Sequence, residues 1–181
     1  MNTKDAVSLL ATAVSTRGGT WADVGAGEGT FTRALAELLG VDAHIYAIDR
    51  DADAIAELSR SVESLDATII PVIADFSRSV ELPNRGDTLL DGMLFANALH
   101  FVRDADAVLA RLARWLRPGG SVVIVEYDRR AASQWVPYPI PLARLAMLAH
   151  AAGLSAPIIT ATRPSSYGGN LYVAQATYFS P

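Results

Sequence analysis

A glycine-rich loop at residues 25–29, with the sequence GAGEG, is the segment whose residue types and spacing most clearly suggest chemistry. It follows a short apolar run at residues 20–24 and precedes a helical pattern of apolar residues at 30–39. In a strand–loop–helix unit, glycines let backbone N–H groups approach a ligand at the positive end of the helix. The pattern therefore predicts a site for a nucleotide-like ligand at this turn.

The charges beside the loop indicate which ligand it holds. The dinucleotide fingerprint is G-x-G-x-x-G, whereas here the third glycine, Gly29, comes one position early. Asp23 and Glu28 place carboxylates that would repel a pyrophosphate but attract a ligand with an ammonium and a sulfonium group. S-adenosylmethionine (AdoMet) carries both cations and no phosphate, so it is the ligand that we expect. In the alternative interpretation the glycines only form a tight turn, and Glu28 only faces the helix dipole.

A further carboxylate, Asp49, supports the same ligand. It follows an apolar run at residues 44–48 and lies twenty positions after Gly29. A carboxylate at that place in a nucleotide-binding α/β unit accepts hydrogen bonds from the hydroxyls of an adenosine ribose. The alternative is an ordinary turn residue at the end of a strand.

A sheet is needed to position these residues, and the rest of the chain predicts one. β-rich runs alternate with amphipathic helical runs, which is typical of an α/β sheet covered on both faces. We expect strands at residues 20–24, 44–48, 67–73, 89–96, 121–127, 156–163 and 171–179, and helices at 5–15, 30–39, 53–62, 105–116 and 142–152. Pro71 predicts an edge or irregular position for the third strand. The link 164–170 is too short for a crossover helix, so the last two strands should be antiparallel. The length fits a single domain, residues 1–181.

Four segments, in this order, resemble the motifs of one enzyme family. WADVGAGEGTFT at residues 21–32 resembles motif I of the class I AdoMet-dependent methyltransferases, and IYAIDR at 45–50 resembles their second motif. VIADF at 72–76 is similar to their adenine-contacting segment, and LRPGG at 116–120 is similar to the turn before their fifth strand. The resemblance covers most of the chain. It implies a small-molecule methyltransferase with a three-layer Rossmann-like fold, whose mostly parallel seven-stranded sheet has an antiparallel C-terminal strand.

The resemblance also implies roles for individual residues. The loop would pack against the methionine part of AdoMet, Asp49 would hold the ribose, and Arg50 would lie along the adenine. Asp75 would accept from the adenine amino group, unless it only caps the next turn, and the Phe76 backbone would contact the ring. Asn97 would lie near the methionine amino group or the reacting methyl. The expected cofactor-binding residues are Asp23, Gly25, Ala26, Gly27, Glu28, Gly29, Asp49, Arg50, Asp75, Phe76 and Asn97.

The acceptor chemistry points to residues that follow the fourth and fifth strands. Methyl transfer is an in-line displacement at an activated carbon, so alignment and electrostatics supply most of the rate. A general base is needed only if the acceptor must lose a proton. His100 can titrate near neutral pH, although the resemblance equally places such a histidine beside the cofactor without a proton-transfer role; Tyr127 is the second catalytic candidate. The expected acceptor-binding residues are His100, Asp128, Trp135 and Tyr138, the last two as an aromatic wall or only as a cover for the core.

Composition argues against several classes of function. The net charge of −4 disfavours tight nucleic-acid binding, which needs a surplus of Lys and Arg. The absence of cysteine and the scattered positions of the three histidines predict no metal site. No apolar run reaches the ~20 residues of a membrane span, and residues 1–10 do not resemble a signal peptide. We therefore expect a cytoplasmic protein.

Three alternatives stay open. Few residues precede the glycine loop, so no long N-terminal lid is expected, and the acceptor pocket is either open or completed by a second subunit in a homodimer. Arg129 and Arg130 either attract an anionic acceptor or are only solvated. The chain is alternatively a non-catalytic AdoMet-binding module or, with less support, a nicotinamide-dependent oxidoreductase.

Overall fold

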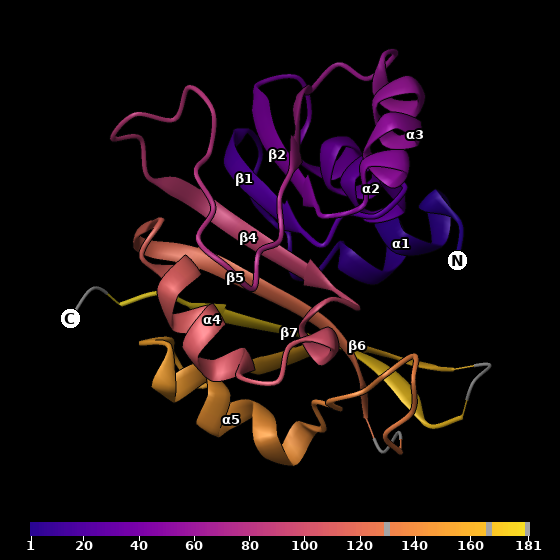
Figure 1. Cartoon of the computed structure of the whole chain (residues 1–181), viewed down its shortest axis with the longest axis vertical. Coiled ribbons are helices and arrows are strands. Elements are labelled where there is room, and N and C mark those ends of the chain that lie inside the picture. Colours follow the sequence, from indigo (N-terminus) through magenta and orange to yellow (C-terminus); the bar gives the residue numbers. More distant parts are fainter. Residues whose placement is uncertain (129–130, 166–167, 180–181) are drawn as a thin grey trace.

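The computed structural model describes residues 1–128, 131–165 and 168–179, and its central feature within these ranges is one seven-stranded sheet (Figure 1). The strands are β1 (Gly19–Val24), β2 (Ala43–Asp49), β3 (Thr68–Ile73), β4 (Leu90–Ala96), β5 (Leu116–Asp128), β6 (Ile158–Pro164) and β7 (Asn170–Thr177). They lie in the order β3-β2-β1-β4-β5-β7-β6. Every pair from β3 to β5 is parallel, whereas β7 is antiparallel to both β5 and β6. This topology confirms the predicted fold class and the antiparallel final pair.

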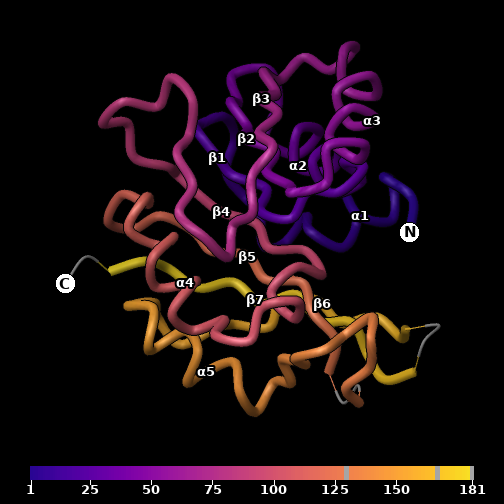
Figure 2. The backbone as a smooth tube through the Cα atoms, in the orientation of Figure 1, coloured from indigo at the N-terminus to yellow at the C-terminus, as the bar shows by residue number. Residues whose placement is uncertain are grey.

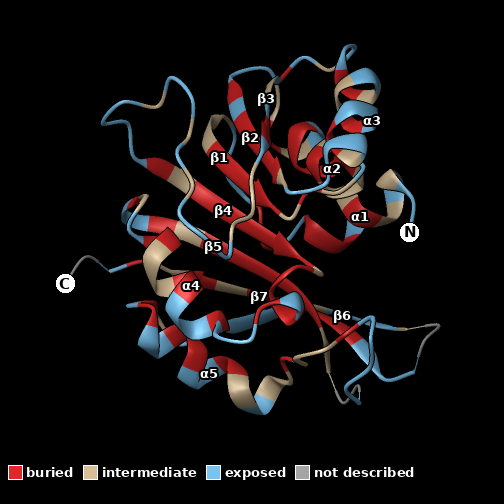
Figure 3. Cartoon of the chain, in the orientation of Figure 1, coloured by how far each residue is buried: buried red, intermediate tan, exposed pale blue. Residues whose placement is uncertain are grey.

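Helices cover both faces of the sheet. They are α1 (Thr3–Leu10), α2 (Thr30–Leu39), α3 (Ala52–Val62), the short 3-10 turn η1 (Leu99–Phe101), α4 (Ala105–Ala113) and α5 (Leu142–Ala151). The first three lie on one face, and α4 and α5 lie on the other (Figure 1). Successive strand residues point to opposite faces, so Trp21 shares a core with Leu35 of α2, while Val24 joins the core under α4 and α5. The central strands are therefore buried on both sides (Figure 3).

The two helices that follow β1 and β2 begin and end on local signals. Leu35 and Leu39 of α2 lie four residues apart on one face and are buried. The chain leaves α2 through Gly40 at φ +86, where glycine is favoured. α3 begins after Asp51, whose side chain accepts from backbone N–H groups in the first turn of the helix. Both helices thus start close to the carboxyl ends of the strands that they follow, β1 and β2.

Three predicted boundaries are wrong. The first helix ends at Leu10 rather than at residue 15, and residues 11–13 form a turn in which the N–H of Ala13 donates to the Leu10 carbonyl at 2.9 Å. The helix expected at 105–116 ends at Ala113, because Leu116 already pairs with β4. The turn expected at 116–120 lies within β5, because Gly119 and Gly120 form backbone hydrogen bonds with Tyr178. In the last two cases, pairing with a distant segment replaces the local preference.

The position predicted for the third strand is confirmed. Pro71 lies in β3, which forms one edge of the sheet. The connection from β3 to β4 contains no helix over residues 74–89, all of which are described (Figure 2). Its first part packs Ala74 and Phe76 against the core. Residues just after β3 therefore stay close to the end of the sheet, where they can form the wall of a cavity.

Gly92 in β4 lies against the ring of Trp21, so a methyl group has no room there. A Cβ at position 92 would be 2.5 Å from two atoms of the buried indole. We expect Gly92→Ala to lower the free energy of unfolding by about 1–3 kcal/mol, as overpacking does, in urea titrations. In a Trp21→Leu background the same change should cost much less, because the ring is absent. An equal cost in both backgrounds would contradict the steric explanation.

Candidate functional site

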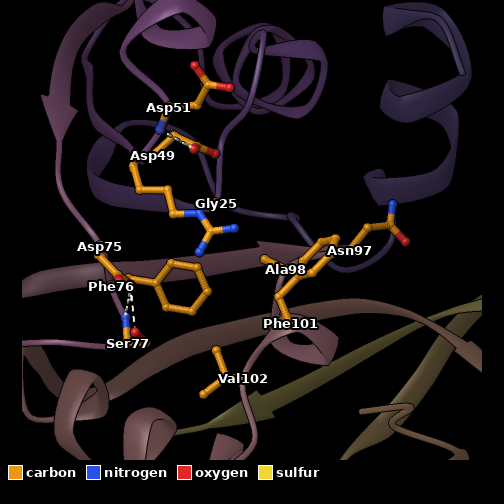
Figure 4. Close-up of a pocket in the computed structure, with 11 residues that line it drawn as sticks. Gly25, Asp49, Asp51, Asp75, Phe76, Ser77, Asn97, Ala98, Phe101 and Val102 are labelled. Atoms are coloured by element: carbon orange, nitrogen blue, oxygen red, sulfur yellow. Dashed lines mark hydrogen bonds between the residues drawn. The ribbon is translucent and has the colours of Figure 1, made fainter. Parts of the chain in front are cut away.

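A cavity of about 260 Å³ opens at the carboxyl ends of β1, β2 and β4 (Figure 4). β1 lies between β2 and β4, so this is the point at which the strand order reverses. Open α/β sheets bind ligands in the crevice at that point. The residues that line the cavity are Gly25, Asp49, Arg50, Asp51, Asp75, Phe76, Ser77, Asn97, Ala98, Phe101 and Val102.

The glycine loop approaches this cavity in a conformation that requires glycine. Gly25 has φ +82, and a Cβ there would stand 2.5 Å from the Cβ of Ala98. Gly27 has φ +52, and a Cβ there would have nothing within 4 Å. The N–H groups of Gly25 and Ala26 donate to the carbonyl of Ile48 at 2.8 and 2.9 Å. The loop is thereby held against the end of β2, and Gly25 forms part of the cavity wall.

Asp49 connects the loop to the cavity. Its Oδ2 accepts from the N–H of Gly27 at 2.8 Å, and its Oδ1 accepts from the N–H of Asp51 at 2.9 Å. Each oxygen of an ionised carboxylate can accept more than one hydrogen bond. Both oxygens therefore keep the capacity to accept from the hydroxyls of a ligand. Asp49 lies in the wall of the cavity, and its contact with a ribose stays a prediction.

Asp75 and Phe76 enter the cavity wall from the connection after β3. Oδ1 of Asp75 accepts from the hydroxyl of Ser77 at 2.6 Å and from its N–H at 3.0 Å. The side-chain bond from Ser77 is the main reason that the pKa of Asp75 lies below its usual value. This geometry fits the turn-capping alternative, although Asp75 also lines the cavity. The side chains of Phe76, Phe101 and Val102 lie along one side of the cavity (Figure 4), and they form an apolar surface against which a flat ring could pack.

Two buried oxygen atoms near the loop, Oδ1 of Asp23 and Oδ1 of Asn97, have no hydrogen-bond partner among the described residues. The other oxygen of Asp23 accepts from the hydroxyl of Thr32 at 2.6 Å. Burial raises the pKa of Asp23 to about 7, although the bond from Thr32 opposes the shift. A buried acceptor without a partner is costly. Asn97 also lines the cavity, so its oxygen fits a ligand group that donates hydrogen bonds, such as an ammonium.

The structure places the predicted cofactor residues in two groups. Those in the cavity wall are Gly25, Asp49, Arg50, Asp75, Phe76 and Asn97. Those that belong to the loop or its strand without lining the cavity are Asp23, Ala26, Gly27, Glu28 and Gly29. Glu28 is exposed and does not line the cavity. The negative charge that the sequence led us to expect beside the ligand is therefore supplied by Asp49, Asp51 and Asp75.

Five lining residues were missed by the sequence analysis: Asp51, Ser77, Ala98, Phe101 and Val102. Ser77 could have been found, because an aspartate two residues before a serine often closes a turn with its side chain. Ala98, Phe101 and Val102 follow Asn97 in an apolar stretch. That stretch gave no sign that it would form the turn η1 and face the cavity.

His100 is buried beside the cavity rather than in its wall. Its Nδ1 lies 2.7 Å from Oε2 of Glu126, and its backbone N–H donates to Oε1 of the same carboxylate at 3.2 Å. The His100 and Glu126 side chains are 3% and 1% exposed. The ring centroids of Phe101 and Tyr127 lie 4.4 and 6.2 Å from that of the imidazole. The pair joins η1 to β5, and the proton-transfer role of His100 stays a prediction. Glu126 was missed, although a lone charge within an apolar strand was the available sign.

The other residues predicted for catalysis or acceptor binding do not line this cavity; they are Tyr127, Asp128, Trp135 and Tyr138. Trp135 is 69% exposed, and the hydroxyl of Tyr138 accepts from Nε of Arg103 at 3.4 Å. Oδ1 of Asp128 accepts from the N–H of Leu142 at 3.2 Å, at the start of α5. Tyr127 lines a second cavity. The arginine pair at 129 and 130 lies outside the described residues, and the predicted acceptor roles stay predictions.

The fold and the cavity together define a Rossmann-like methyltransferase domain. A family model described as a methyltransferase domain matches residues 22–120, more than half of the chain, and the chain belongs to this family. The family predicted from the four motifs is thus confirmed. Demethylmenaquinone methyltransferase of Bacillus mycoides (strain KBAB4) is 31% identical over 104 residues, which are 58% of this chain and 43% of that protein. The chain spans less than half of the length of this curated relative.

Solved structures share the same fold over nearly the whole chain. One is the 1,6-didemethyltoxoflavin-N1-methyltransferase of Burkholderia thailandensis with bound 1,6-didemethyltoxoflavin and S-adenosylhomocysteine. It has a TM-score of 0.77 and 22% identity and covers 98% of this chain and 78% of that one. Another is the N-methyltransferase NodS of Bradyrhizobium japonicum WM9 with S-adenosyl-L-homocysteine, with a TM-score of 0.77, 16% identity and coverage of 97% and 86%. At these identities the similarity shows the fold.

Asp23 should make the stability of the protein depend on pH. Its pKa is raised from 3.8 to about 7 in the folded chain, so between these values unfolding releases a proton and stability falls as the pH rises. Asp23→Asn cannot ionise and can still accept from Thr32. We expect the difference in free energy of unfolding between Asp23→Asn and the unchanged protein to rise by up to about 4 kcal/mol, in favour of the variant, between pH 4 and 7.

Urea unfolding of the ligand-free protein at several pH values measures this difference. Asp87→Asn, which removes a carboxylate from an exposed loop residue, is the control and should show no such trend. A difference between Asp23→Asn and the unchanged protein that is the same at all pH values would rule out the ionisation of Asp23 as its cause.

Proposed function

We propose that this chain is an AdoMet-dependent methyltransferase that transfers a methyl group to a small-molecule acceptor. The observation that carries the proposal is the charge of the cavity at the glycine loop. Asp49, Asp51 and Asp75 place three carboxylates in its wall against the guanidinium of Arg50, while Arg78, outside the wall, lies 3.5 Å from Asp75. This excess of negative charge favours a cationic nucleoside over a diphosphate. Membership of the methyltransferase family supports the same activity.

The residues present fit the parts of AdoMet. Asp49 is fixed by two backbone N–H groups and would accept from the ribose hydroxyls. The apolar surface of Phe76, Phe101 and Val102 would take the adenine ring. The buried Oδ1 of Asn97, which has no partner among the described residues, would accept from the ammonium. The ribose hydroxyls and the ammonium, which both donate hydrogen bonds, thus each have an acceptor in the cavity wall.

The chain itself must mainly align two reactants. Bound AdoMet supplies a methyl group whose bond to sulfur breaks as the acceptor atom attacks, while sulfur keeps the bonding electrons to give S-adenosylhomocysteine. The cavity wall would hold the cofactor in one orientation, which favours the in-line geometry. If the acceptor must lose a proton, His100 and Tyr127 are the candidates. A carboxylate at Nδ1, here that of Glu126, favours the tautomer in which Nε2 accepts the proton.

Small acceptors are supported by the names of similar proteins, which include demethylmenaquinone and 1,6-didemethyltoxoflavin. Within the described ranges, none of the helices has the length and apolar character that crossing a membrane requires. A single domain, a cytoplasmic location and a homodimer stay predictions, which domain-boundary proteolysis, cell fractionation and light scattering would test.

Removing the charge of Asp49 should weaken AdoMet binding. In Asp49→Asn the amide nitrogen must face one of the two backbone N–H groups, so both the loop and the ribose contact are disturbed. We expect the Kd for AdoMet to rise about 10- to 100-fold, which corresponds to the loss of about 1.5–3 kcal/mol from a charged hydrogen bond. Isothermal titration calorimetry with AdoMet, S-adenosylhomocysteine and NADH measures this, with Asp87→Asn as the control.

The same titrations test the function as a whole. The unchanged protein should bind AdoMet and S-adenosylhomocysteine but not NADH. Binding of NADH alone, or no binding of AdoMet at millimolar concentration, would overturn the proposal. Tight AdoMet binding without methyl transfer to any member of a broad acceptor panel would instead support a non-catalytic binding module.

A further inference from the structure

A second cavity, of about 390 Å³, adjoins the cofactor cavity and shares Asn97 with it. Its volume is typical of small-molecule sites, which span roughly 300–1,000 Å³. In the first cavity, Asn97 lies on the side away from Asp75 and Ser77 (Figure 4). Asn97 is therefore the border between the two cavities, and a molecule in the second one would meet the cofactor there.

The sheet brings the other residues of this second cavity together from distant parts of the chain. Besides Asn97 they are Met1, Tyr127, Arg163, Pro164, Ser165 and Leu171. Tyr127 of β5 is paired with Leu171 of β7, and Leu171 is paired with Arg163 of β6. Directly paired residues of antiparallel strands point to the same face. These three side chains therefore form one row across three strands.

The walls of the second cavity differ in charge from those of the first. Among the described residues that line the second cavity, Arg163 has the one charged side chain. The first cavity is instead lined by three aspartates. Met1, Pro164 and Leu171 add apolar surface, and Tyr127 adds an aromatic ring. A guanidinium presents a planar fork of donors that matches a carboxylate. The combination suits a flat or aromatic molecule with an acidic group at one end.

Arg163 is held only loosely by its own partner. Its Nη1 lies 3.5 Å from Oδ1 of Asp5 in α1, and the two side chains are 47% and 39% exposed. Exposed ion pairs of this kind contribute little to stability, because water and salt screen them. The guanidinium can therefore exchange Asp5 for the carboxylate of a ligand at small cost, and Asp5 acts as a competitor for that ligand.

We propose that the second cavity is the acceptor site and that it selects small flat acids, whose carboxylate or similar anionic group is bound by Arg163 while the reacting end points to Asn97. This inference rests on the methyl-transfer function proposed above. Arg163 is then a specificity-determining residue, and Asp5 sets how strongly it attracts the acid.

The test uses a pair of probes that differ in charge, 4-hydroxybenzoate and 4-hydroxybenzamide, titrated into protein saturated with S-adenosylhomocysteine. Ligand-observed NMR or calorimetry should show that the unchanged protein binds the acid at least about tenfold more tightly than the amide. Arg163→Gln should abolish this preference. Asp5→Asn, which removes the competing carboxylate, should increase the affinity for the acid several-fold and leave that for the amide unchanged.

Arg60→Gln is the matched control, because it also breaks an exposed arginine–carboxylate pair. In this pair Nη2 of Arg60 lies 2.6 Å from Oε2 of Glu57, and both residues belong to α3. Arg60 lines neither cavity. It should behave as the unchanged protein does. Equal binding of the two probes to protein that binds S-adenosylhomocysteine, or a preference that survives Arg163→Gln, would overturn the inference and leave the proposed function intact. Failure to bind S-adenosylhomocysteine at all would instead count against the proposed function.

Discussion

The hydrogen bond from the N–H of Gly27 to Oδ2 of Asp49 joins the loop after β1 to the end of β2, and the cofactor cavity depends on this connection. Two further bonds, from Gly25 and Ala26 to the carbonyl of Ile48, act at the same junction. Asp49 is therefore both an anchor of the loop and part of the cavity wall. Because its two oxygens are already oriented by backbone donors, a ligand would not have to order this carboxylate when it binds, and such preorganisation lowers the cost of binding.

Two side chains fix the opposite wall of the cavity, Arg111 of α4 and Glu126 of β5. With no helix between β3 and β4, Phe76 lies in an irregular segment, and Arg111 of α4 donates to its carbonyl at 2.7 Å. The turn η1 is held in a similar way, because Glu126 accepts from both the backbone and the ring of His100. A buried carboxylate is tolerated at position 126 because each of its oxygens has a partner. These contacts replace the packing that a helix would otherwise supply.

The sequence predicted the features that depend on neighbouring residues and missed those that depend on distant ones. The positions of the strands followed from hydrophobic period, the antiparallel final pair from link length, and the edge position of β3 from Pro71. The loop and Asp49 followed from residue types at fixed spacing. The pairing of Glu126 with His100 joins residues 26 positions apart, and the pairing of Gly119 and Gly120 with Tyr178 spans most of the C-terminal half. Neither partner can be identified from the residues that neighbour the other in sequence. Glu28 was misleading for the opposite reason, since nearness in sequence did not place its side chain in the cavity wall.

The antiparallel β7 explains how one sheet can carry two adjoining cavities of opposite charge. Because β7 runs against β5 and β6, its first residues lie beside the last residues of both, at the carboxyl edge where β1, β2 and β4 also end. A parallel β7 would place its last residues there and would require a long crossover in place of the link 164–170. The observed hairpin brings Arg163 to this same carboxyl edge, where Asn97, which is neutral, lines both its cavity and that of the aspartates. A cationic cofactor and an anionic acceptor would each be disfavoured in the wrong cavity, so the arrangement discriminates through repulsion as well as attraction.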